Sequence, residues 1–174
     1  NKNIINVIKQ NLVKSKLAKS IRNGFLVSIV GKPNTGKSSF INYISGRDVS
    51  IVTNIPGTTT DSLEVPLDID GYKFRFMDTA GIRKHKNLIE KLGIEKTQKN
   101  SLISDLNIVF LEQNETNMYK DIPNKIYVKS KQDLRKKRNN KRGLIEISSK
   151  TGFGTRRLIK LIKSRLINSD LEKT

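Results

Sequence analysis

One stretch of the chain combines residue types and spacing that can bind the phosphates of a nucleotide. Residues 31–38, with the sequence GKPNTGKS, match the pattern G-x-x-x-x-G-K-[S/T] at every fixed position. Such a loop points successive backbone N–H groups at one anion, and the N-terminus of the following helix adds its partial positive charge. We expect Lys37 to reach the β- and γ-phosphates and to act in catalysis, and the Ser38 hydroxyl to bind Mg²⁺. The predicted nucleotide contacts in this loop are Asn34, Thr35, Gly36, Lys37, Ser38 and Ser39.

The segments on either side of the loop have the patterns that a phosphate-binding loop requires. An apolar run at residues 25–30 predicts a buried strand that enters the loop, and residues 39–44 predict the helix that leaves it. A glycine-rich turn that matches the pattern by chance is the alternative. The strand before the loop and the helix after it argue against that alternative.

Two further segments can complete a magnesium and γ-phosphate site. Asp78 follows a predicted strand and can hold Mg²⁺ through water, while Gly81 lets its N–H approach the γ-phosphate. Thr58, Thr59 and Thr60 lie in a polar loop, where a threonine can close the Mg²⁺ coordination and touch the γ-phosphate. We assign the metal contact to Thr59 and expect Thr58 to contact the nucleotide as well. Loss of the γ-phosphate would release this loop, which is the physical basis of a switch.

The residues after the predicted strand at 125–129 can select the base. The Asp133 carboxylate can accept hydrogen bonds from N1–H and the 2-amino group of guanine, an arrangement that adenine does not offer. The stem of Lys131 would stack on the base plane, and a backbone N–H within Ser148, Ser149 and Lys150 could meet the guanine O6. Helix capping by Asp133 and a serine-rich capping turn at 148–150 are the alternatives that remain open.

Apolar runs and turn signals predict alternating strands and helices in the rest of the chain. Further strands are expected at residues 62–69, 72–77, 106–111, 125–129 and 144–147, and further helices at residues 1–22, 90–102 and 158–166. Asp70-Gly71 is typical of a hairpin turn, and Pro66 suits an edge strand. We expect a short helix or none between Leu111 and Lys125. This order predicts an α/β fold: a mostly parallel sheet with one antiparallel edge strand and helices on both faces.

Composition narrows the class of protein. The 174 residues suffice for one domain, and the absence of cysteine excludes disulfides and fits a reducing compartment. No apolar run approaches the roughly 20 residues that span a bilayer, so we expect a cytoplasmic protein without a membrane partner. The net charge of +18 and the basic run at 135–142 allow contact with RNA. The alternative to RNA binding is that the basic run is a solvated loop in a chain rich in Lys and Asn.

Taken together, these segments resemble the translation-factor-like GTPases. The runs at residues 31–39, 46–61, 78–83 and 89–95 narrow the resemblance to the potassium-activated TrmE-Era-EngA-like GTPases, and within them to the G domain of the MnmE (TrmE) family of tRNA modification GTPases. The segment IEKLGIE at 89–95 is close to that family and much less like the Der/EngA ribosome-assembly GTPases. The resemblance covers about residues 20 to 167.

The resemblance implies a Ras-like G domain, a P-loop NTPase fold, at residues 23–168. The helical periodicity of residues 1–22, ahead of the first strand, predicts a helical connector from a neighbouring domain, and residues 169–174 are expected to form a tail. The expected activity is GTP hydrolysis with Mg²⁺ and K⁺. In this family Asn34 would bind K⁺ through its side chain, together with the carbonyl groups of Thr53 and Ile55, and the ion would offset charge as an arginine finger does elsewhere. Glu90 matches the catalytic glutamate that orients the attacking water. The implied partners are GTP and GDP, a second G domain, an MnmG-like protein and tRNA.

The chain departs from the family pattern in three respects. Ser130 stands where the family has Asn in the guanine motif, which puts one amide contact in doubt, and Thr60 replaces Arg before Asp61. The folate-binding domain, most of the helical domain and the C-terminal Cys motif are not in this sequence. We therefore expect a fragment that cannot itself modify the wobble uridine, and a shortened stand-alone GTPase is the alternative.

Two other functions compete with the GTPase hypothesis. One is a slow-hydrolysing, GTP-gated RNA-binding module, for which Ser130, the short 111–125 connection and the basic run are the arguments. The other is a Der/EngA-like ribosome-assembly GTPase, against which the Glu90 segment and the single phosphate loop argue.

Overall fold

The computed structural model describes most of the region that contains the predicted motifs. The described residues are 22–46, 64–78, 100–112, 115–135 and 143–168, together with residues 4, 7, 11, 15, 18 and 20. Positions predicted for the metal-binding loops at 53–60 and for residues 81 and 90 lie outside these ranges.

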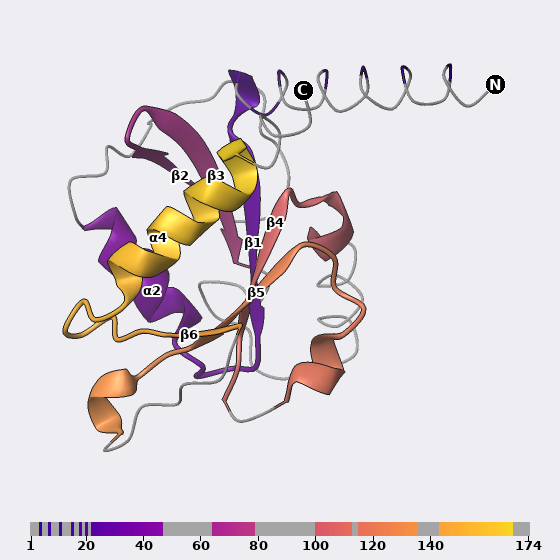
Figure 1. Cartoon of the computed structure of the whole chain (residues 1–174). Helices are drawn as coiled ribbons and strands as arrows, with labels where there is room; N and C mark the ends of the chain where they lie inside the picture. The colour runs from indigo at the N-terminus through magenta and orange to yellow at the C-terminus, as the bar shows by residue number, and fades with distance from the viewer. Residues whose placement is uncertain are drawn as a thin grey trace.

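A six-stranded sheet forms the centre of the described chain (Figure 1). Its strands are β1 (Phe25–Gly31), β2 (Glu64–Ile69), β3 (Tyr72–Asp78), β4 (Leu106–Phe110), β5 (Lys125–Lys129) and β6 (Leu144–Glu146), in the spatial order β2-β3-β1-β4-β5-β6. All neighbouring strands are parallel except β2 and β3, which pair as an antiparallel hairpin at one edge. The predicted α/β fold with one antiparallel edge strand is therefore confirmed.

The edge hairpin follows the turn signal in the sequence. Asp70 and Gly71 form the turn, and the Gly71 N–H donates to Asp68 Oδ1 at 2.9 Å. Pro66 lies opposite Arg75 on β2, the outer strand of the sheet, where a residue without an N–H costs least.

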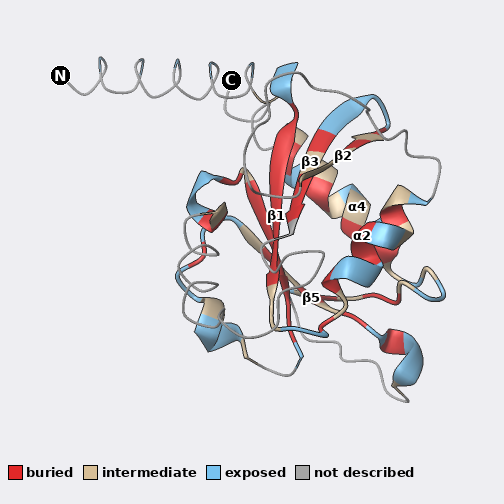
Figure 2. Cartoon of the chain, turned by 180° about the vertical axis from the view of Figure 1, so that it is seen from behind, coloured by how far each residue is buried: buried red, intermediate tan, exposed pale blue. Residues whose placement is uncertain are grey.

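Two helices cover one face of the sheet: α2 (Lys37–Ser45) and α4 (Thr155–Lys163), the second continuing into a π-helical turn, η3 (Ser164–Asn168). They bury apolar side chains against alternate residues of β1, as the red side of both helices shows in Figure 2. Phe40 of α2 and Phe110 of β4 lie with their ring centroids 5.7 Å apart in this core. Phe40, Ile41 and Ile44 bury one face of α2 in this core, which holds the helix against the sheet directly after the phosphate-binding loop.

The opposite face has a smaller core made by Val30, Val109, Leu111 and Ile122. The described residues of the connection between β4 and β5 contain one short 3₁₀ helix, η1 (Thr116–Tyr119), in line with the short helix that the sequence predicts. Residues 100–103 are the described end of the helix expected at 90–102, and the buried Asn107 side chain donates to the Ser101 and Pro123 carbonyl groups.

The described positions before β1 are helical, and this helix ends at Asn23, before Gly24 with φ +87°. Ile4 and Val7 on it are exposed to solvent. None of the helices in the described part of the chain has the length and apolar character needed to cross a membrane.

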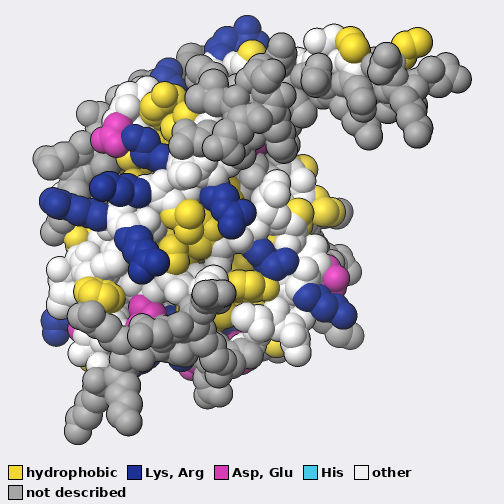
Figure 3. Space-filling model, viewed as in Figure 1, with side chains coloured by type: hydrophobic (Ala, Val, Ile, Leu, Met, Phe, Trp, Pro, Cys, Tyr) yellow, Lys and Arg dark blue, Asp and Glu magenta, His cyan; other side chains and the backbone are white. Residues whose placement is uncertain are grey.

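Basic side chains gather on the last helix. Residues 155–168 contain five basic side chains, Arg156, Arg157, Lys160, Lys163 and Arg165, and no acidic one. All of them except the half-buried Lys163 are exposed. Figure 3 shows Lys and Arg side chains spread over the face of the molecule that α4 covers.

Candidate nucleotide-binding site

The phosphate-binding loop leaves β1 at Gly31 and enters α2 at Lys37, and its two fixed glycines sit where no side chain fits. Gly31 has φ +148°, and a Cβ on it would lie 2.4 Å from the carbonyl oxygen of Phe110. Gly36 has φ +95°, and a Cβ on it would lie 2.4 Å from Ser130 Oγ. The glycines therefore let the loop approach β4 on one side and the segment after β5 on the other.

The N-terminus of α2 can offer backbone N–H donors to an anion. The bond from the Phe40 N–H to the Gly36 carbonyl, 3.0 Å long, is the first of the helix. The N–H groups of Ser38 and Ser39 precede it, at positions that have no acceptor within a helix. These groups and the helix dipole favour a phosphate at this position.

The side chain of Lys37 is buried in the phosphate-binding loop. It is only 4% exposed, and Nζ donates to the carbonyl oxygens of Gly31 at 2.7 Å and Lys32 at 2.6 Å. Thr35 is buried as well, and its hydroxyl donates to the same Lys32 carbonyl at 2.8 Å. The loop thus carries a preplaced ammonium group where the β- and γ-phosphates are expected.

An ion pair holds the outer side of the loop. Lys32 Nζ donates to Glu115 Oε1 at 2.5 Å, and Glu115 directly precedes η1. This hydrogen bond raises the pKa of the Lys32 amine above its ordinary value. Because Lys32 is partly exposed, the contact orients the loop more than it stabilises the fold.

The segment after β5 lies against the phosphate-binding loop. Ser130 is buried, and its hydroxyl donates to the Thr35 carbonyl. Lys131 has φ +59°, and its Nζ donates to the Asn34 carbonyl at 2.7 Å. Residues that are 95 and 97 positions apart in the sequence therefore meet in one site.

Asp133 lies in a short 3₁₀ helix, η2 (Gln132–Leu134), and faces the loop that follows β6. Its Oδ1 accepts a hydrogen bond from Ser148 Oγ at 2.6 Å, and the Gln132 N–H donates to the Ile147 carbonyl at 3.0 Å. The hydrogen bond from Ser148 is the largest cause that lowers the pKa of the Asp133 carboxyl group. The carboxylate is thus ionised and oriented at neutral pH, as an acceptor for guanine must be.

The capping alternatives can be compared with this geometry. Lys131 and not Asp133 occupies the N-cap of η2, and Gly154 occupies the N-cap of α4. Ser148 does accept a bond from the Thr151 N–H at 3.2 Å, so it stabilises its own turn in addition to holding Asp133.

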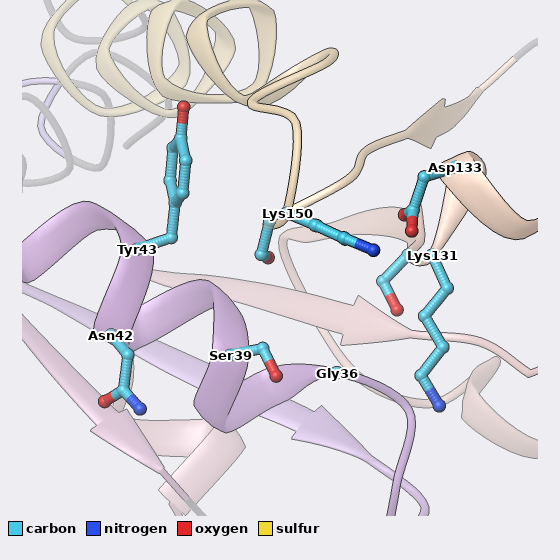
Figure 4. A pocket seen from close by; sticks show the side chains of 9 residues that line it. Gly36, Ser39, Asn42, Tyr43, Lys131, Asp133 and Lys150 are labelled. Atoms are coloured by element: carbon cyan, nitrogen blue, oxygen red, sulfur yellow. The ribbon is translucent and has the colours of Figure 1, made fainter.

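A cavity of about 460 Å³ lies between α2 and these two loops (Figure 4). It is lined by Gly36, Ser39, Asn42, Tyr43, Ser130, Lys131, Asp133, Ser149 and Lys150. Lys150 extends across it toward Asp133, and Lys131 runs from the side of Asp133 to the phosphate-binding loop. Six of the predicted nucleotide contacts, Gly36, Ser39, Lys131, Asp133, Ser149 and Lys150, therefore border one cavity.

Asn42 and Tyr43 were not predicted as part of this site. They stand three and four residues after Ser39 on α2, and this spacing puts all three side chains on one side of the helix. The helical spacing from Ser39 was the signal in the sequence that could have found them.

The structure also shows what the first residue of the basic run does. Arg135 donates from Nη2 to the Ser130 carbonyl at 2.8 Å and pairs with Glu146 at 3.9 Å. Arg135 therefore braces the loop that carries Lys131 and Asp133, while residues 136–142 lie outside the described ranges.

The predicted metal ligands are described only in part. Ser38 is exposed at the start of α2, and the backbone of Asp78 ends β3 beside Ile29 of β1. The side chain of Asp78 lies outside the described part of the chain, as do Thr53, Ile55, Thr58, Thr59, Gly81 and Glu90. Strands β1 and β3 are parallel neighbours, so their carboxyl ends lie side by side. Ser38, which follows β1, and Asp78, which ends β3, therefore belong to the carboxyl end of the parallel strands.

A phosphate-binding loop and an oriented carboxylate over one cavity, on a sheet with this strand order, define a GTPase domain of the P-loop class. The chain belongs to the 50S ribosome-binding GTPase family, whose model matches residues 26–149.

Among curated proteins the chain is similar to tRNA modification GTPases MnmE. It is 37% identical over 151 residues to the one from Agrobacterium fabrum, covering 84% of this chain and 34% of that protein. It is 37% identical over 170 residues to the one from Mycoplasma mobile, covering 98% of this chain and 36% of that protein. The match to the Neorickettsia sennetsu protein reaches 51% over 104 residues, or 60% of this chain and 19% of that protein. The chain thus spans about a third or less of the length of these relatives.

Solved structures show the same fold at lower identity. Aquifex aeolicus Era bound to GDP.AlF4- matches with a TM-score of 0.58 and 24% identity over 79% of this chain and 55% of that one. The cytosolic domain of Thermotoga maritima FeoB in its GDP form matches with a TM-score of 0.61 and 22% identity over 82% of this chain and 63% of that one. The predicted resemblance to MnmE-type G domains and the predicted fold are both confirmed.

Proposed function

We propose that this chain hydrolyses GTP with the help of Mg²⁺ and K⁺, as the G domain of an MnmE-like protein that takes part in modification of the tRNA wobble uridine. Its membership of a GTPase family and its similarity to proteins named tRNA modification GTPase MnmE support this proposal. The role in tRNA modification would belong to the longer protein, because the chain spans about a third of such relatives.

The single observation that carries the proposal is the joining of base and phosphate loops at one cavity. Ser130 and Lys131 each donate to a carbonyl group of the phosphate-binding loop. Asp133 follows Ser130 by three residues and borders the same cavity. A nucleotide whose phosphates lie at the start of α2 can therefore present its base to the Asp133 carboxylate. This geometry favours a guanine nucleotide over an adenine nucleotide.

Each residue then has a defined task in hydrolysis of the phosphoanhydride bond between the β- and γ-phosphates. Lys37 would exchange its carbonyl partners for the β- and γ-phosphate oxygens and stabilise the charge that develops there. Backbone N–H groups at the start of α2, such as those of Ser38 and Ser39, would bind the same phosphates. Glu90 would orient the attacking water for in-line attack on the γ-phosphate.

The residues present fit both ions in their donor chemistry. Ser38 and Asp78 offer a hydroxyl and a carboxylate, the hard oxygen ligands that Mg²⁺ prefers. Asn34 is exposed on the loop with φ +61°, and its amide oxygen is the proposed K⁺ ligand, with the Thr53 and Ile55 carbonyl groups. When bound, both ions would supply positive charge beside the phosphates. The pairing of two G domains and contact with an MnmG-like partner remain part of this proposal.

The test is GTP hydrolysis with Mg²⁺, compared in KCl and NaCl at equal ionic strength. We expect a rate gain specific to K⁺ that Asn34→Ala abolishes. Asn117→Ala, which changes an exposed asparagine on η1, is the matched control and should keep the gain. Equal rates in both salts, with GTP still bound, would contradict the potassium role and leave a GTP-binding module.

A GTP-gated RNA-binding module is the second candidate, and the basic face of α4 favours it. Its exposed arginine and lysine side chains have no acidic residue among them within residues 155–168. Such a face can bind phosphate groups of RNA without reading bases. Binding of tRNA that weakens steeply with salt and changes between GDP and GTP would support this function.

A further inference from the structure

Ser130 joins the base loop to the phosphate-binding loop through a buried hydrogen bond. Its hydroxyl donates to the Thr35 carbonyl, and the residue is 4% exposed. The hydroxyl also lies against Gly36, since a Cβ on that glycine would come within 2.4 Å of it. Ser130 is thus fitted between the two loops and is not directed into solvent.

The donor capacity of this side chain is used up by that bond. A serine hydroxyl has one proton to donate, and here the proton goes to a backbone carbonyl. The asparagine that the MnmE-type motif has at this position carries two N–H donors and can serve two acceptors. The substitution therefore removes a donor from the cavity while it keeps the connection between the loops.

The position of Ser130 determines which atom of the base loses a partner. If Asp133 accepts from N1–H and the 2-amino group, the five-membered ring of guanine points back toward the ribose and the phosphate-binding loop. On that side Ser130 contacts Gly36 at the border of the cavity. The N7 atom of guanine, which can only accept a hydrogen bond, lies in that ring.

We propose that this site selects guanine without a hydrogen bond to N7 from position 130, because Ser130 spends its only proton on fixing the two loops to each other. This inference rests on the proposed binding of guanine nucleotides. Ser130 is then a positioning residue. Discrimination between guanine and other bases depends on N1–H and the 2-amino group, which Asp133 faces.

The test compares the affinities of the unaltered chain for GDP, 7-deaza-GDP and IDP by competition with a fluorescent GDP. Replacing N7 by a C–H group should change affinity by less than about twofold, whereas loss of a real hydrogen bond costs roughly fivefold or more. A 7-deaza-GDP affinity at least about fivefold below that for GDP would overturn the proposal.

IDP separates this inference from the function on which it rests. It lacks the 2-amino group, so it should bind about tenfold or more weakly, because a hydrogen bond to a charged acceptor is lost. Equal binding of GDP, IDP and ADP would reject guanine recognition itself. Weak IDP binding together with weak 7-deaza-GDP binding would reject only the claim about N7.

Ser130→Ala tests the connection between the loops. It should lower affinity for GDP and 7-deaza-GDP by the same factor, about fivefold, because the buried Thr35 carbonyl loses its partner. Ser104→Ala is the matched control: that buried hydroxyl donates to the Asn100 carbonyl at 2.7 Å, away from the cavity, and its loss should leave both affinities unchanged. Unchanged GDP affinity in Ser130→Ala, or a selective loss for GDP, would overturn the proposal.

Discussion

Replacement of Gly31 by alanine should destabilise the domain far more than a routine loop substitution. The new Cβ would lie 2.4 Å from the Phe110 carbonyl oxygen and 3.0 Å from the Phe110 Cβ. Gly31 pairs with Phe110 in the sheet, so the atom that it meets is backbone of the neighbouring strand and cannot rotate away. Strands β1 and β4 must move apart at the end that carries the phosphate-binding loop.

The expected loss of stability follows from two contributions. Overpacking of a well-packed region costs about 1–3 kcal/mol. Forcing a residue with a side chain to φ +148° adds on the order of 1–3 kcal/mol. A total of roughly 2–6 kcal/mol corresponds, at about 2–4 °C per kcal/mol, to a melting temperature about 4–24 °C lower for a domain of this size.

Gly71→Ala is the control that isolates the steric part. Gly71 also has a positive φ, +81°, but a Cβ on it would meet nothing within 4 Å. That variant should therefore show only the backbone cost, on the order of 1 kcal/mol. Thermal unfolding of the nucleotide-free chain, followed by circular dichroism at a fixed heating rate, measures both variants. If Gly31→Ala melts no lower than Gly71→Ala, the close approach of β1 and β4 at the loop is not the reason for this glycine.

Two further predictions concern the base-binding carboxylate. Asp133→Asn should weaken GDP binding by about tenfold or more, because its amide would direct a donor at the donors of guanine. Asp121→Asn, which changes an exposed residue outside the cavity, is the control and should bind GDP normally. Isothermal titration calorimetry with GDP measures both affinities. The hydrogen bond from Ser148 lowers the pKa of Asp133. The ionised form is therefore favoured, GDP affinity should hold until the pH falls to that lowered pKa, and in Ser148→Ala the loss should begin at a higher pH. A pH titration in which both proteins lose affinity at the same pH would contradict that role of Ser148.

Strands β1 and β4 were predictable because their apolar runs are buried on both faces. In β1 and β4 nearly every residue is buried, so hydrophobicity alone locates them to within one or two residues. The hairpin was predictable for a different reason, since Asp70-Gly71 supplies the positive φ values that its turn requires. The shortened connection before β5 followed from the few residues available for it.

The contacts within the site were much less accessible from the sequence. The motifs placed Lys37, Asp133 and Ser148 near a nucleotide, but nothing in the pattern showed that Ser148 orients Asp133 or that Lys37 binds two carbonyl groups of its own loop. The bond between Ser148 and Asp133 depends on the distance between loops that follow different strands, which the sheet sets and local sequence does not. The departure at Ser130 was visible in the sequence, whereas its bond to the phosphate-binding loop was visible only in three dimensions.

The bond between Ser130 and Thr35 also bears on when the nucleotide-binding site is completed during synthesis of the chain. The phosphate-binding loop emerges from the ribosome about a hundred residues ahead of the loop that follows β6, because translation proceeds from the N-terminus. A nascent chain that has reached only β4 has the residues to contact phosphates but no wall for the base. Ligand binding stabilises the states that bind, and the cavity that takes both the phosphates and the base is complete only after β5 and β6 have joined the sheet. The nucleotide therefore stabilises the finished domain more than the first half of the chain as it folds.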